Sequence, residues 1–272
     1  MKEKPSGNGY RKSLSATESR VLSDLVFRGK TMFAREDLAS YGVDAKRFLS
    51  RLRSKGWIAR IKRGVYLIAP LEAGRDGARS HTVHSFVLAS RLVQPYYIGY
   101  WSALSYHGMT EATPPAVYLA STVHLNSRVI FDVRMVFVSL RPWKMFGMDT
   151  VVIEGSEVTL SDREKTIVDC LDHPEHAGGI AQIRDVLEDE LGRLDFGKVF
   201  RYARRMRNST VLKRLGYILG ILGHPEMAER ISRSSLGEGY SKLDPRFPNT
   251  GPTNERWKLR LNVRLPSKGG RR

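Results

Sequence analysis

The chain has 272 residues, of which 41% are hydrophobic and 9% are aromatic. This composition is typical of a globular protein with a sizeable core and excludes a disordered one. The formal net charge of +17 favours an anionic partner, and nucleic acid is the first candidate because no apolar run is long enough to span a membrane. The N-terminal segment lacks the apolar core of a signal peptide, and the single Cys170 excludes an internal disulfide. We therefore expect a cytoplasmic protein without a membrane partner.

The distribution of charge, glycine and proline predicts the domain organisation. Residues 1–13 are polar and basic, which predicts a flexible tail. Pro70, two glycines and mixed charges interrupt every periodic pattern between residues 70 and 79, and we interpret residues 71–79 as a linker. We therefore expect one domain at residues 14–70 and a larger one at residues 80–272, which ends in a basic C-terminal tail.

The first domain is predicted to be a winged helix-turn-helix unit. Ser15 and Glu18 match the capping box that opens a helix, which runs to about Phe27. A short second helix ends at Gly42, since glycine readily adopts the left-handed conformation of helix ends. Asp44 then caps a third helix. The inward face of this third helix consists of Ala45, Phe48, Leu49 and Leu52.

Cations and hydroxyl groups dominate the outward face of the third helix and the wing, which consists of strands at 57–61 and 65–69. Residues 1–70 contain sixteen Lys or Arg residues against six Asp or Glu residues. Such side chains reach base edges and phosphates in a major groove. The predicted DNA-binding residues are Lys46, Arg47, Ser50, Arg51, Arg53, Ser54, Arg60, Lys62 and Arg63. Units of this kind also serve as protein-docking modules, and this alternative stays open.

The second domain is predicted to be mixed, with strands first and helices later, so the fold class is α+β. Strands are expected at 117–121, in two segments within 129–140 with a turn near 132–134, and at 151–158, and helices at 180–191, 195–206 and 209–222. Ser161 and Glu164 match a second capping box. The aromatic segment 96–108 is interpreted as core packing, although rings of this kind also stack on bases. Gly216 and Gly220 form a GxxxG motif that indicates close helix packing.

Two polar clusters resemble a metal site or an active site. Residues 169–176 contain one Cys, two His and three acidic residues. Their spacing matches no paired-ligand pattern of zinc sites, so we interpret the cluster as a helix end and expect neither a metal nor a cofactor. Asp162, Glu164 and Lys165 resemble part of a magnesium-dependent nuclease centre. Their spacing is wrong for that chemistry, and we assign no catalytic residue.

A second group of cations lies in the predicted helices of the larger domain. Arg201, Arg204 and Arg205 have the three- and four-residue spacing that brings side chains onto one helix face. The possible second basic surface consists of Arg201, Arg204, Arg205, Arg207, Lys213 and Arg214. A partner with an acidic patch or an RNA is one interpretation of this surface. A solvated helix face without a partner is the other.

Several short motifs follow the winged unit in an order and spacing that resemble one family. They are Tyr97–Gly99, Ser102–Gly108, Glu164–Leu171, Leu215–Leu219, Leu243–Pro245 and Arg256–Trp257. Together with the winged unit they make the chain similar, over nearly its whole length, to the AbiEi antitoxins of abortive-infection toxin–antitoxin systems.

The resemblance implies a type IV-like antitoxin of phage defence that also represses its own operon. The winged domain would bind double-stranded operator DNA with inverted repeats. The second domain would counteract a cognate nucleotidyltransferase-like toxin, which it need not contact, and no catalysis is implied. Two alternatives stay open. One is a nuclease or other DNA-processing enzyme that the winged domain delivers to DNA, and the other is a plain regulator whose second domain senses a ligand or partner.

Overall fold

The computed structural model describes residues 11–69 and 83–269. The chain forms two compact units, residues 1–92 and 93–272. The linker expected at 71–79 and most of the tail expected at 1–13 lie outside the described residues. Helices and strands occur in both units, which confirms the α+β class. Within the two described ranges, no helix is long and apolar enough to cross a membrane.

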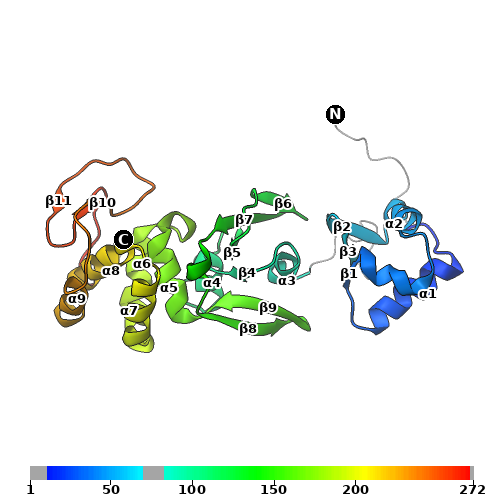
Figure 1. Cartoon of the computed structure of the whole chain (residues 1–272), viewed down its shortest axis with the longest axis horizontal. Helices are drawn as coiled ribbons and strands as arrows, with labels where there is room; N and C mark the ends of the chain where they lie inside the picture. The colour runs from blue at the N-terminus through cyan, green and yellow to red at the C-terminus, as the bar shows by residue number, and fades with distance from the viewer. Residues whose placement is uncertain (1–10, 70–82, 270–272) are drawn as a thin grey trace. The chain divides into compact units, whose positions relative to one another are not determined.

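The N-terminal unit begins with the predicted winged arrangement (Figure 1). Its elements are α1 (Ala16–Phe27), β1 (Met32–Ala34), the 3-10 helix η1 (Arg35–Tyr41), α2 (Ala45–Ser54), β2 (Ile58–Lys62), β3 (Val65–Ile68) and α3 (Ser85–Ser90). The capping box of α1 is confirmed, because the Ser15 hydroxyl accepts from the Glu18 N–H at 3.3 Å and the Glu18 carboxylate accepts from the Ser15 N–H at 2.8 Å. Gly42 ends η1 in the left-handed conformation, as predicted, with φ of 64°.

The core of this unit forms where α1, η1 and α2 meet. Its buried side chains include Val21, Leu25, Leu38, Phe48 and Leu52. The three strands form an antiparallel sheet in the order β1, β3, β2. Strand β1 was not predicted from the sequence, because it is only three residues long and owes its extended form to pairing with β3.

The second unit contains a six-stranded mixed sheet in the order β6, β7, β5, β4, β9, β8. The strands are β4 (Tyr96–Ile98), β5 (Val117–Ser121), β6 (Arg128–Ile130), β7 (Val133–Ser139), β8 (Met148–Ile153) and β9 (Ser156–Ser161), with α4 (Tyr100–Tyr106) after β4 and the 3-10 helix η4 (Pro142–Lys144) after β7. The expectation of one strand at 151–158 is wrong. The chain reverses at Glu154 and Gly155, both with positive φ, so that β8 and β9 form a hairpin.

Helices follow the sheet, and α5 to α8 gather on one side of it in the second unit (Figure 1). They are α5 (Arg163–Asp172), α6 (Ile180–Glu190), α7 (Phe196–Arg205), α8 (Ser209–Ile221) and α9 (Pro225–Ser232), with the 3-10 helices η5 (Pro174–His176) and η6 (Leu191–Arg193). The short strands β10 (Ser241–Lys242), β11 (Thr253–Asn254) and β12 (Leu259–Arg260) form a small sheet after them. The layer of helices contains a large core that includes Ile167, Leu187 and Leu215, and Trp257 from the segment after the helices packs into it.

The GxxxG motif of α8 packs against an aromatic ring rather than against another helix. A Cβ atom added to Gly216 would lie 2.1 Å from the ring of Trp257, whereas one added to Gly220 would meet nothing within 4 Å. The predicted close packing therefore exists at one glycine only, and its partner is a tryptophan from the segment after the helices. Gly216 is needed because the indole lies where a side chain would be.

The capping box predicted for α5 is wrong in its first residue. Asp162, not Ser161, precedes the helix, and its carboxylate accepts from the Lys165 N–H at 2.7 Å. The Ser161 hydroxyl instead bonds to the Thr166 hydroxyl at 2.7 Å. Glu164 has no capping role either, since its carboxylate accepts from the Lys198 ammonium at 2.8 Å.

A buried polar group joins β4 to α5. The hydroxyl of Tyr97 donates to the Asp169 carboxylate at 2.9 Å and accepts from the Lys165 ammonium at 2.9 Å, while Lys165 also pairs with Asp169. Tyr97 and the adjacent Tyr100 are fully buried. Their burial confirms that the aromatic segment contributes to the core.

Candidate nucleic-acid interface

Helix α2 is fixed in the N-terminal unit at both ends. At its start, the Asp44 carboxylate accepts from the Arg47 N–H at 3.1 Å, which satisfies one of the free helix donors. Beyond its end, the Lys55 ammonium pairs with the Glu18 carboxylate at 2.5 Å, and these side chains are 22% and 3% exposed. Helix α2 is therefore tied to the start of α1, and its outer face has a defined orientation within the unit.

The outer face of α2 carries the side chains that the sequence predicts for DNA contact. All six of its predicted residues are exposed: Lys46, Arg47, Ser50, Arg51, Arg53 and Ser54. Phe48, Leu49 and Leu52 are buried on the opposite side. Because 3.6 residues complete a helical turn, this separation leaves one continuous polar and cationic face.

The wing places its three predicted cations in different environments. Arg60 and Arg63 are exposed, and Gly64, with φ of 80°, allows the tight turn beside Arg63. Lys62 is half-buried, and its ammonium donates to the backbone carbonyl of Leu92 at 3.2 Å. Arg60 and Arg63 are thus better placed than Lys62 to contact an external phosphate.

The cations on α2 and the wing are poorly neutralised by the protein itself. The Arg47 guanidinium lies 3.6 Å from the Asp44 carboxylate, but both side chains are largely exposed, which makes such a pair weak. The hydrogen bond from the Arg47 backbone N–H lowers the pKa of Asp44. No residue within 11–69 or 83–269 forms a salt bridge with Arg51, Arg53 or Arg63. The surface is therefore electropositive and suited to a polyanion.

Four of the six cations of the possible second basic surface are exposed. They are Arg201, Arg204, Arg205 and Arg207. Arg204 and Arg207 line a pocket of about 540 Å³ together with Arg230 and Arg233 of the α9 segment. Arg230 and Arg233 were not predicted from the sequence, although Pro225 at a helix start followed by this three-residue spacing is a usable signal.

Lys213 and Arg214 do not belong to that surface. Both are buried, with exposed fractions of 2% and 4%. The Lys213 ammonium donates to the Gly239 carbonyl, and the Arg214 guanidinium donates to the carbonyls of Leu171 and Lys242 at 2.6 and 3.0 Å. They hold the chain segments around α8 together, so their assignment to a binding surface is wrong.

The three residues that resemble a nuclease centre are occupied by protein contacts. Lys198 approaches Asp162 at 3.3 Å and Glu164 at 2.8 Å, so one ammonium is shared between the two carboxylates. Burial raises the pKa of Glu164, but the hydrogen bonds that its carboxylate accepts from Lys198 and from the Asp195 N–H outweigh burial and lower the pKa. Lys165 is fully buried in the group with Tyr97. The three side chains therefore do not share an open site.

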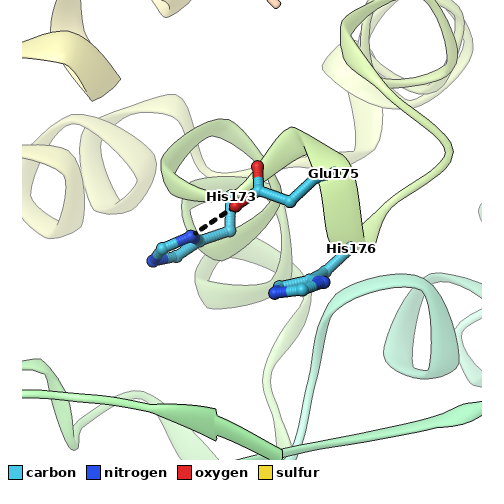
Figure 2. Close-up of side chains that lie close together, drawn as sticks. All are labelled: His173, Glu175 and His176. Carbon is cyan, nitrogen blue, oxygen red and sulfur yellow. Dashed lines mark hydrogen bonds and ion pairs between the residues drawn. The ribbon is translucent and has the colours of Figure 1, made fainter. Parts of the chain in front are cut away.

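The turn between α5 and α6 brings two histidines and a carboxylate together. Figure 2 shows the Glu175 carboxylate directed at the ring of His173, with the His176 ring beside it. The His173 Nδ1 and Glu175 Oε1 atoms are 2.9 Å apart, and the two imidazole rings stack with centroids 5.8 Å apart. Although burial disfavours protonated His173, the contacts with Glu175 and Asp172 raise its pKa.

Comparison with protein families bears on the winged unit. Residues 20–69 match the family model described as "Transcriptional regulator, AbiEi antitoxin". The winged unit is similar to the AbiEi antitoxins over these residues. The matched segment contains every residue predicted to contact DNA, and the resemblance stated from the sequence is confirmed for it.

The fold beyond the AbiEi segment has a counterpart among solved structures. The crystal structure of the RV2827C protein from Mycobacterium tuberculosis is similar, with a TM-score of 0.66 and 15% sequence identity. The similarity covers 91% of this chain and 92% of that chain. At this identity the comparison concerns the fold alone, and its coverage includes both units. A comparison with curated proteins gives no significant match.

Proposed function

We propose that this protein represses its own operon and acts as the antitoxin of an abortive-infection system. In this proposal α2 enters the major groove of operator DNA that carries inverted repeats. The observation that carries it is the division of α2 into a buried apolar face and an exposed face with four cations and two hydroxyls, without one acidic residue in the helix. Exposed cations of this kind supply the electrostatic part of DNA affinity.

The two parts of the interface have different tasks. Recognition helices read bases mainly with residues near their N-terminus, which assigns base contact to Lys46, Arg47 and Ser50. Arg60 and Arg63 of the wing contact phosphates, which position the helix without reading sequence. Lys62 contributes less because its ammonium already bonds to the Leu92 carbonyl.

An inverted repeat presents two equivalent half-sites, so two copies of the chain bind one operator. The antitoxin activity belongs to the second unit and counteracts a nucleotidyltransferase-like toxin encoded beside it. The resemblance to the AbiEi antitoxins supports this part, and it requires no stable complex with the toxin. The arginine-lined pocket of α7 and α9 is the candidate surface for an anionic partner, because Arg204, Arg207, Arg230 and Arg233 surround it.

Binding to the DNA that precedes the gene tests the repressor proposal. In fluorescence anisotropy, Lys46→Ala and Arg47→Ala should each weaken binding to this DNA by about 5- to 150-fold, which corresponds to about 1–3 kcal/mol for a base contact. Arg20→Ala removes an exposed cation from α1 and serves as the control. Unchanged affinity in both α2 variants would exclude α2 as the reading helix.

Growth rescue tests the antitoxin proposal separately. Cells arrested by the product of the neighbouring gene should grow again when the full chain is produced with it. The double variant Lys46→Ala, Arg47→Ala should still rescue growth, because the two activities belong to different units. Loss of rescue in this variant, together with loss of DNA binding, would contradict the division. The double variant Arg204→Ala, Arg230→Ala tests the pocket directly, because rescue should fail if the pocket binds the partner.

A further inference from the structure

The turn after α5 has a geometry that the linear spacing of its residues does not reveal. Pro174 starts the 3-10 helix η5, and a 3-10 helix has three residues per turn. Side chains three residues apart therefore lie above one another, which explains why the rings of His173 and His176 stack. Glu175 lies between them in sequence and turns its carboxylate back to His173.

The three side chains present one ligand atom each within a small volume. A nitrogen of His173, a nitrogen of His176 and a carboxylate oxygen of Glu175 all lie within 4.8 Å of one another. A tetrahedral ion with bonds of about 2.1 Å holds its ligand atoms roughly 3.4 Å apart. Small rotations of the side chains are thus sufficient to bring the three atoms to metal-binding distances.

A neighbouring carboxylate is placed to orient His173. The Asp172 carboxylate lies 3.5 Å from the Nε2 atom of His173, whereas Glu175 contacts the other ring nitrogen, Nδ1. Asp172 is itself held by the Lys144 ammonium and the Asn208 amide, each at 2.6 Å. Histidines that bind metals commonly donate their second ring N–H to a carboxylate, which fixes the ring and its tautomer.

Tyr100 provides an independent sign of a ligand at this turn. Its ring lies edge-on to both imidazoles, with centroids 6.1 Å from His173 and 5.6 Å from His176. Its hydroxyl is buried and forms no hydrogen bond with any residue that the structure describes. Its backbone has φ of 55°, a conformation that costs energy for a residue other than glycine. Strained backbones cluster at functional sites, and a bound water or ion is one explanation of a buried hydroxyl without a partner.

Access and donor chemistry define the kind of ion. The side chains of His173 and Glu175 are 32% and 36% exposed, so an ion can enter and keep positions for water or another ligand. Two imidazoles and one carboxylate suit a first-row transition metal, whereas Mg²⁺ and Ca²⁺ prefer oxygen ligands alone.

We propose that His173, Glu175 and His176 form a binding site for one divalent transition-metal ion, for which Zn²⁺ is the probe. The bound ion fastens the turn between α5 and α6 and keeps an open coordination position at the surface of the second unit.

Calorimetric titration of the full-length protein, without a histidine tag and freed of metal by a chelator, tests the site. Zn²⁺ should bind with a stoichiometry of one per chain, and Mg²⁺ should not compete. Glu175→Gln and His176→Gln should each weaken Zn²⁺ binding at least about tenfold. His124→Gln is the matched control, because His124 is an exposed histidine that bonds to Ser139 outside the turn.

Unchanged Zn²⁺ binding in both variants, or an equal loss in the His124 control, would overturn the proposal. Thermal unfolding without metal verifies that the variants are folded. Co²⁺ titration of the unaltered protein gives a second measurement that needs no variant. Absorption bands of Co²⁺ with four or five ligands are expected, and a spectrum that remains that of the hydrated ion would overturn the proposal.

Discussion

Removing two cations from the DNA-facing surface should change the salt dependence of binding by a calculable amount. The double variant Arg51→Ala, Arg63→Ala removes one cation from α2 and one from the tip of the wing. Both side chains are exposed, and neither has a salt bridge among residues 11–69 and 83–269. The folded structure therefore loses no ion pair, and the effect on binding reports the charge alone.

The magnitude follows from the release of counterions. Each phosphate contact contributes about −0.9 to the slope of log K against log salt concentration, so the loss of two contacts makes the slope shallower by about 1.8. Between about 50 and 200 mM salt, the unaltered protein should therefore lose roughly 12 times more affinity than the variant.

Anisotropy titrations on a duplex with one half of the repeat measure this slope for a single bound chain. The control is Arg20→Ala, Arg28→Ala, which removes one exposed cation from α1 and one from the residue after it, where Arg28 pairs with Asp24, and changes the net charge equally. Equal slopes in the unaltered protein and the Arg51, Arg63 variant would refute the proposed contacts. Equal changes in the variant and the control would assign the effect to overall charge.

Two further predictions concern stability and are measured by denaturant unfolding. Gly216→Ala should destabilise the second unit by about 1–3 kcal/mol because its methyl group would overlap the Trp257 ring. Gly220→Ala should instead stabilise it by up to about 1 kcal/mol, and equal effects would contradict this packing. Burial opposes ionisation of Glu18, but the hydrogen bonds from Lys55 and the Ser15 backbone outweigh it and lower its pKa. A lowered pKa stabilises the fold at a pH above the ordinary glutamate pKa of about 4.3. The unaltered protein should therefore be more stable than Glu18→Gln at neutral pH, and this difference in the free energy of unfolding should disappear as the pH falls below that value. A difference that stays constant with pH would contradict the ion pair.

The sequence predicted those features that are decided within a few residues. The Ser15 and Glu18 capping box, the left-handed Gly42 and the Asp44 cap all depend on contacts that span three or four positions. The outer face of α2 could be predicted for the same reason, because helical periodicity alone separates exposed from buried positions. The fold class and the wing followed from these local signals.

Features that depend on distant segments could not be predicted in this way. Lys213 and Arg214 look like surface cations in a helix, but carbonyl groups of Gly239 and Leu171, remote in the sequence, accept their hydrogen bonds in the interior. Ser161 matches the capping-box pattern, but in the folded chain its hydroxyl bonds to Thr166 and the neighbouring Asp162 accepts from the Lys165 N–H instead. The two histidines near Glu175 met no known spacing rule, because a single 3-10 turn creates their proximity.

The short strand β4 has a consequence for the order in which the sheet folds. The pairs β6–β7 and β8–β9 are hairpins, and β4 pairs with β5 soon after it in the chain. Strand β4 meets β9 through Ile98 and Leu160, and closing a loop of roughly 60 residues before such a contact forms makes this pairing slow. We therefore expect the two halves of the sheet to join last. Until they do, each half presents an unpaired edge, so the late folding intermediate is the form of this protein most prone to aggregation.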